Sequence, residues 1–177
     1  REQFDALDMV RSLALHHSDL LQPMVKQVAR SLASAADSLR SSVCKNGLLA
    51  IHDFCDGLGQ GVEGQLGVLS KCLMKRAADT SNIFISASAN EALVKLIERC
   101  PSPRLVTTLL SQAKTKNASI RCKVAQSLSF SIDCHGPNLI DGGDVAKVVQ
   151  MCADFLADGK PGTRQAGRRL AWSLNET

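Results

Sequence analysis

Seven cysteines and four histidines are the residues of this sequence that could bind a metal ion or form a nucleophile and base pair. Zinc sites and redox pairs bring such residues together at short spacings such as Cys-x-x-Cys. The cysteines here lie singly along the chain, and their odd number argues against a disulfide framework. We therefore expect reduced thiols that fill the core at Cys44, Cys55, Cys72, Cys100, Cys122, Cys134 and Cys152. We expect neither these cysteines nor the histidines to bind a metal or a cofactor or to take part in catalysis. The histidines are His16, His17, His52 and His135.

A glycine-rich run at residues 57–61 is the one segment that could be compared with a nucleotide-binding loop. Such a loop follows a β-strand, and the sequence before Gly57 has a helical pattern instead. We expect a helix end followed by a turn, with no phosphate site and no nucleophile elbow.

The elements that must position any site are helices that repeat along the chain. Val43, Ile85, Ile120 and Thr163 occupy equivalent positions, separated by 42, 35 and 43 residues. Four residues later the chain has Gly47, Ala89, Val124 and Gly167, and eight residues later it has Ile51, Leu93, Leu128 and Ala171. Periods of about 40 to 47 residues are typical of HEAT and armadillo helix pairs. The fold class expected is an all-α HEAT-repeat solenoid, in keeping with 3% aromatic residues and no tyrosine.

We expect a single domain over residues 1–177, cut from a longer multidomain protein and monomeric by itself. It should contain a half repeat at 1–17 and helix pairs at 18–58, 60–99, 102–134 and 136–177. No apolar run reaches the roughly 18 residues of a membrane span, so no membrane contact is expected. A net charge of +4 permits nucleic acid binding, but without interleaved aromatics we expect none.

Basic residues recur at the starts of the second helices of these pairs. They are Arg40 and Lys45, then Arg121 and Lys123, then Arg164 and Arg168. Positive charge is unfavourable at a helix N-terminus, so the recurrence indicates a function, although each residue alone could be an ordinary solvated side chain. Stacked repeats align these loops along one edge. We expect this edge to be the binding surface, and we expect charge reversal at Arg121 and Arg164 to leave stability nearly unchanged.

The four loops with their following helices resemble TOG domains, most closely those of the crescerin and cytoplasmic linker-associated protein group. The segments that carry the resemblance are 39–43, 81–85, 117–123 and 163–172. The resemblance implies a paddle of HEAT repeats that binds the tubulin heterodimer or the microtubule lattice without catalysis. It places the protein in the cytoplasm, at the cytoskeleton, cilium, centrosome or basal body. The tubulin-binding residues implied are Ser41, Ser42, Val43, Cys44, Lys45, Asn82, Phe84, Ile85, Asn117, Ser119, Arg121, Lys160, Thr163, Arg164 and Arg168.

Two departures leave a second interpretation open. Ser42 and Ser86 stand where members of this group often carry a basic residue, so the chain could instead be a HEAT-repeat scaffold that has lost tubulin binding. Within the third loop, Phe84 precedes the core position of Ile85 by one residue, or about 100° around a helix. We therefore expect Phe84 to lie on the surface if Ile85 is buried.

Overall fold

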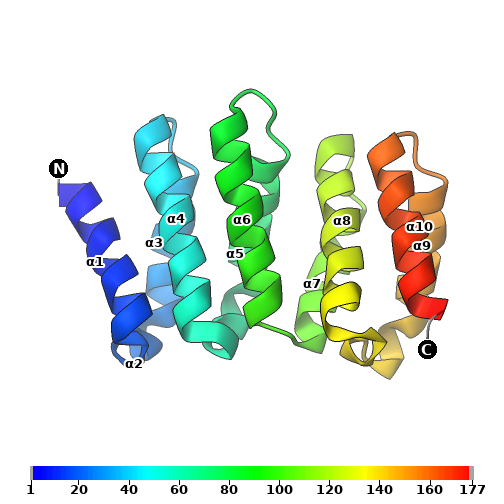
Figure 1. The fold of residues 1–177 in the computed structure, drawn as a ribbon, viewed down its shortest axis with the longest axis horizontal. Helices are drawn as coiled ribbons and strands as arrows, with labels where there is room; N and C mark the ends of the chain where they lie inside the picture. The colour runs from blue at the N-terminus through cyan, green and yellow to red at the C-terminus, as the bar shows by residue number, and fades with distance from the viewer. Residues whose placement is uncertain (1, 176–177) are drawn as a thin grey trace. The chain divides into compact units, whose positions relative to one another are not determined.

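A computed structural model describes residues 2–175, in which all regular structure is helical. The chain divides into two compact units, Arg1–Cys100 (unit 1) and Pro101–Thr177 (unit 2). Each unit is built from antiparallel helix pairs joined by short loops (Figure 1). The all-α repeat fold expected from the sequence is confirmed.

Unit 1 consists of one single helix followed by two helix pairs. Helix α4 packs against α1, α3 and α6, and α5 packs against α3 and α6. In Figure 1 the loops from α3 to α4 and from α5 to α6 lie at the same end of this unit. The bounds are α1 Glu2–His16, α2 Ser18–Leu21, η1 Gln22–Met24, α3 Val25–Ala36, α4 Ser41–Leu58, η2 Gly59–Gln65, α5 Leu66–Ala77 and α6 Ile83–Arg99.

Unit 2 consists of two helix pairs. Helix α8 packs against α7 and α10, and α9 packs against α10 and α7. The loops from α7 to α8 and from α9 to α10 lie at the same end of this unit (Figure 1). The bounds are α7 Pro103–Ala113, α8 Ala118–His135, η3 Pro137–Leu139, η4 Gly142–Asp144, α9 Val145–Leu156 and α10 Pro161–Asn175.

The repeat register read from the sequence describes the core of both units. Val43, Ile85 and Thr163 are buried, and Ile120 is half-buried. All four residues at the next equivalent position, from Gly47 to Gly167, are buried. A Cβ added to Gly47 would lie 2.6 Å from the backbone nitrogen of Ala36, so this glycine lets α3 and α4 approach closely.

Two local features differ from or refine the sequence expectation. The segment expected to begin a helix at residue 60 is a 3-10 helix, Gly59–Gln65, before α5 begins at Leu66. Gly59 ends α4 with a positive φ of 50°, which confirms the helix end expected in the glycine-rich run, but a 3-10 helix follows in place of the expected turn. None of the described helices is long and apolar enough to span a membrane.

Candidate functional site: the intra-repeat loops

Most of the thiols lie in the core. No group of three metal-binding side chains occurs within residues 2–175. Five cysteines are buried, Cys72 is half-buried and Cys134 is exposed, so the expectation of core thiols is wrong for Cys134 alone. Burial raises the pKa of Cys72 and of Cys100 to about 11, which keeps these thiols protonated and weakly nucleophilic at neutral pH.

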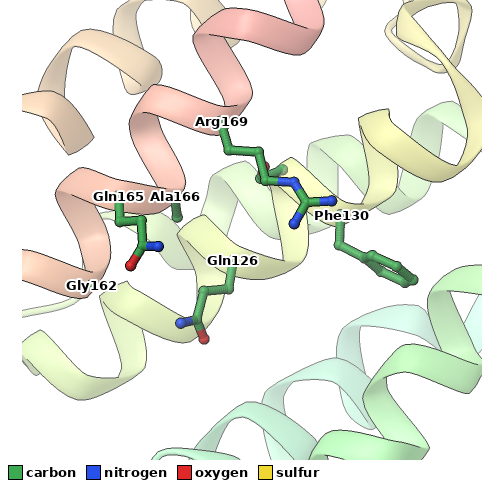
Figure 2. Close-up of a pocket in the computed structure, with 7 residues that line it drawn as sticks. Gln126, Phe130, Gly162, Gln165, Ala166 and Arg169 are labelled. Atoms are coloured by element: carbon green, nitrogen blue, oxygen red, sulfur yellow. The ribbon is translucent and has the colours of Figure 1, made fainter.

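A hollow between α8 and α10 of unit 2 is lined by amide, aromatic and small side chains (Figure 2). Gln126 lies on α8 and Gln165 on α10, while Arg169 extends from α10 across α8. Arg169 forms an ion pair with Asp133. The lining contains neither a carboxylate nor an imidazole nor a thiol that could act as a base, so acid–base catalysis has no candidate group there.

The loop edge of unit 1, formed by residues 37–45 and 79–84, exposes apolar side chains. Leu39 is 99% exposed, Ile83 is 74% exposed and Phe84 is 73% exposed. The neighbouring polar and basic residues Arg40, Ser41, Ser42 and Lys45 are exposed as well. Side chains of this kind contribute nothing to the core, and a cluster of them on one edge is typical of an interaction surface.

Four residues of the implied tubulin-binding set lie in the core instead of on the edge: Val43, Cys44, Ile85 and Thr163. The first turn of each of these helices points at least one side chain inward, because a helix that begins beside its partner must cover the end of the core. Their assignment as direct contact residues is therefore corrected. The contrast between buried Ile85 and exposed Phe84 confirms the expected offset around α6.

Two asparagines of the same set cap helices. The side chain of Asn82 accepts hydrogen bonds from the backbone nitrogens of Phe84 and Ile85, at 3.1 and 3.2 Å. Asn117 does the same for Ser119 and Ile120, at 2.9 and 3.1 Å. Asparagine is a favoured N-cap because its oxygen satisfies backbone donors that have no partner in the helix. Both residues thus fix where α6 and α8 begin, a role that the sequence analysis did not assign.

Arg121 is held by structural contacts at the loop edge of unit 2, which is formed by residues 114–121 and 157–164. Its Nε lies 2.8 Å from Oδ2 of Asp158, and its Nη1 donates to the carbonyl oxygens of Thr115 and Lys116 at 2.9 and 3.1 Å. The hydrogen bond from Arg121 holds the pKa of Asp158 below its usual range. Arg121 therefore holds the loop before α8 in shape, and its positive charge is neutralised by the carboxylate of Asp158.

Arg164 occupies the equivalent position of the next repeat and makes the equivalent loop contacts. Its Nη1 donates to the carbonyl oxygens of Asp158 and Gly159 at 2.9 and 2.8 Å. Lys160 Nζ in turn donates to Ser119 Oγ at 2.9 Å. These hydrogen bonds argue against the expectation that charge reversal at Arg121 and Arg164 leaves stability nearly unchanged, because reversal would break them.

Unit 1 fastens its first loop with an acidic residue that sequence reasoning missed. Asp37 pairs with Lys75 at 2.7 Å and with Arg76 at 3.0 Å, and Arg76 also donates to the carbonyl oxygen of Ser38 at 3.3 Å. Asp37 directly follows α3, and Asp158 lies two residues after the end of α9, so an acidic residue shortly after the first helix of a pair was a signal that could have identified both.

The two loop edges also differ in their electrostatic setting. Unit 1 contains eleven basic and eleven acidic residues, whereas unit 2 contains ten basic and six acidic residues, so the net charge of +4 belongs to unit 2. Burial lowers the pKa of Lys123 at the start of α8. Arg168 is exposed on α10. Unit 2 thus offers a positive surface and unit 1 a neutral, partly apolar one.

Known proteins similar to this chain are long, and the chain matches a small part of each. The TOG array regulator of axonemal microtubules protein 1 of Mus musculus is 27% identical over 98% of this chain and 10% of that protein. Crescerin-like protein che-12 of Caenorhabditis elegans is 24% identical over 99% of this chain and 14% of that protein. The chain therefore spans only about a tenth to a seventh of the length of these relatives.

Solved structures show the same fold at low sequence identity. A structure described as "Crescerin uses a TOG domain array to regulate microtubules in the primary cilium" has a TM-score of 0.70 and 22% identity, over 98% of this chain and 73% of that chain. One described as "TOG-tubulin binding specificity promotes microtubule dynamics and mitotic spindle formation" has a TM-score of 0.74 and 16% identity, over 97% and 70%. The family described as CLASP N terminal matches residues 11–177, and the chain belongs to this family.

Proposed function

We propose that this chain is a non-catalytic tubulin-binding module of a microtubule regulator and that it binds through its intra-repeat loops. The observation that carries the proposal is the exposed apolar group on the unit 1 edge, Leu39, Ile83 and Phe84. Exposed aromatic side chains that have no role in the core are typical anchors of protein interfaces. An enzyme would instead need a group of reactive side chains.

The relatives support tubulin as the partner. Their names describe regulators of axonemal microtubules and TOG arrays, and a similar solved structure is described in terms of TOG–tubulin binding. By this likeness the protein would act at the cytoskeleton, in the cilium or axoneme, and would influence microtubule dynamics. Unit 2 with its net charge of +4 suits an acidic partner such as tubulin, because positive potential speeds encounter and sets orientation.

The contact residues proposed are solvent-accessible members of the two edges. On unit 1 they are Ser41, Ser42, Lys45 and Phe84, to which we add Leu39 and Ile83. On unit 2 they are the exposed Arg168 and the half-buried Ser119, Lys160 and Arg164. Val43, Cys44, Ile85 and Thr163 would support the edge from beneath, and Asn82, Asn117 and Arg121 would hold its loops in place.

Co-elution with purified tubulin on size-exclusion chromatography, followed by microtubule co-sedimentation, tests the proposal. Phe84→Ala should weaken binding at least about tenfold, since interface anchors contribute roughly 2 kcal/mol or more. Met9→Ala is the matched control, because Met9 is also exposed and apolar in unit 1 but lies in the middle of α1. Equal binding by Phe84→Ala and the wild type would contradict the proposed anchor, and no binding by the wild type would contradict the function.

A HEAT-repeat scaffold without tubulin binding is the second candidate. It is favoured by the commitment of Arg121 to Asp158, which leaves one fewer free charge on the unit 2 edge. Under this candidate the wild-type chain would neither co-elute with tubulin nor co-sediment with microtubules at low salt, where exposed charges act most strongly.

A further inference from the structure

Asp158 is the centre of a hydrogen-bond network that joins the two loops of unit 2. Its Oδ2 accepts from Arg121 Nε at 2.8 Å, its Oδ1 accepts from the backbone nitrogen of Lys160 at 2.8 Å, and its carbonyl oxygen accepts from Arg164 at 2.9 Å. The side chain of Asp158 is only 9% exposed. It is therefore placed to organise other residues and is poorly placed to touch a partner.

The contacts of Asp158 cross from one helix pair to the next. Arg121, which Asp158 holds, closes the loop between α7 and α8, whereas Asp158 itself lies in the loop between α9 and α10. Lys160 and Ser119 form a second connection between the same two loops. In unit 1, Cys44 occupies the position equivalent to Arg121 and donates to Ala36 within its own helix pair. The direct connection through a helix-start arginine is thus a property of unit 2.

We propose that Asp158 is a positioning residue for partner binding, because it ties the two loops of unit 2 into one preorganised edge. The proposal rests on the proposed function, in which that edge contacts an acidic protein. Ordering two loops before binding removes an entropic cost that separate loops would incur in the complex. The effect of Asp158 on affinity therefore arises through Arg121 and Lys160 and not through a contact of its own.

The proposal predicts a change opposite in sign to that expected from charge alone. Asp158→Asn retains one oxygen to accept from Lys160, but it presents an amide or a neutral oxygen where Arg121 meets a carboxylate. Removing a negative charge from a positive edge would by itself strengthen attraction to an acidic partner. If Asp158 positions the loops, the same substitution instead weakens binding, by about tenfold, through faster dissociation.

Hydrogen exchange and tubulin-binding kinetics on three chains test the proposal: wild type, Asp158→Asn and Asp154→Asn. Asp154 is an exposed residue of α9 that accepts a hydrogen bond from Gln150, so its variant makes the same charge change away from the loops. We expect faster exchange at the amides of Ser119, Ile120 and Arg121, in the first turn of α8 directly after the other loop, only in Asp158→Asn. We expect unchanged or slightly tighter tubulin binding for Asp154→Asn and weaker binding for Asp158→Asn.

Two results would overturn the proposal. One is unchanged exchange at residues 119–121 in Asp158→Asn, which would show that the loops are not coupled through this carboxylate. The other is tubulin binding by Asp158→Asn as tight as that of Asp154→Asn, which would show that Asp158 affects binding only through its charge. If the wild type fails to bind tubulin, the proposed function fails, and the exchange measurement still decides the loop connection because it needs no partner.

Discussion

The two units share one repeat register but fill a key position with different chemistry. In unit 1 the residue directly after the core position of the first turn has a short side chain. Cys44, after Val43, donates to the carbonyl oxygen of Ala36, and Ser86, after Ile85, donates to that of Ala77 at 2.8 Å. In unit 2 the equivalent residues are Arg121 and Arg164, and each donates to two carbonyl oxygens of its loop. The two short side chains thus satisfy a backbone oxygen at the end of the first helix, whereas the two arginines satisfy backbone oxygens of the loop that follows it.

The two edges also differ in what they expose. In unit 1 each short side chain reaches one helix-end carbonyl, and the apolar residues Leu39, Ile83 and Phe84 are exposed on the same edge. In unit 2 the longer side chains of Arg121 and Arg164 reach over the loop, and their N–H groups donate to its carbonyl oxygens. Arg121 and Arg164 at the helix starts of unit 2 bind loop carbonyls, which offsets their unfavourable place in the helix dipole.

The largest effect is expected at the core position of the first turn, where the units differ in burial. Ile85 in unit 1 is buried, whereas Ile120 in unit 2 is half-buried. Ile85→Ala should lower the free energy of unfolding by about 2–5 kcal/mol, and Ile120→Ala by clearly less, because less apolar surface returns to water. Urea denaturation measures both variants.

Phe84→Ala is the control for that comparison. Its side chain is largely exposed, so its effect on the free energy of unfolding should lie within about 0.5 kcal/mol. A loss in Phe84→Ala as large as that in Ile85→Ala would place Phe84 in the core and remove it from the proposed edge.

The next largest effect separates the two arginines of unit 2. Arg121→Ala removes the partner of a mostly buried carboxylate and two loop hydrogen bonds, so it should cost about 1–3 kcal/mol of stability. Arg164→Ala removes hydrogen bonds to neutral carbonyls only and should cost about 0.5–1.5 kcal/mol. Thermal and urea denaturation would compare them, and equal losses would mean that the pair with Asp158 adds no stability.

The sequence predicted the helix pairs, their loops and most of the core, because these depend on apolar periodicity and on loop residues that are local in the chain. It did not predict that Arg121 forms an ion pair with Asp158 and hydrogen bonds with its own loop. An ion pair between residues 121 and 158 depends on how one repeat is displaced against the next, and no local pattern records that displacement. Val43, Ile85 and Thr163 were assigned to the edge by family likeness, although their place in the repeat register points inward.

Glycine positions offer a smaller test of the same comparison. Gly47 and Gly167 are equivalent, but an added Cβ would lie 2.6 Å from backbone at Gly47 and 3.0 Å from the nearest atom, the Cβ of Phe155, at Gly167. Overpacking should make Gly47→Ala less stable by about 1–3 kcal/mol. At Gly167 the gain of roughly 0.5–1 kcal/mol in helix propensity should offset most of the strain. A Gly47→Ala chain as stable as Gly167→Ala would show that α3 and α4 can separate freely.

The smallest effect concerns the carboxylates that fasten the loops. Hydrogen bonds from Arg121 to Asp158 and from Lys75 to Asp37 lower the pKa of both acids below their usual value of 3.8. A lowered pKa in the folded state means that each pair stabilises the fold above pH 3.8 and loses this contribution as the pH falls through the folded-state pKa. Melting temperatures measured from pH 6 to pH 3 should therefore be level at first and fall below about pH 4.

The fall in melting temperature should be shallower in Asp158→Asn. It should be shallower to a lesser degree in Asp37→Asn, because the side chain of Asp37 is half exposed and its pair is screened by solvent. If the melting temperature falls as steeply below about pH 4 in Asp158→Asn as in the wild type, ionisation of this carboxylate is not linked to the stability of unit 2.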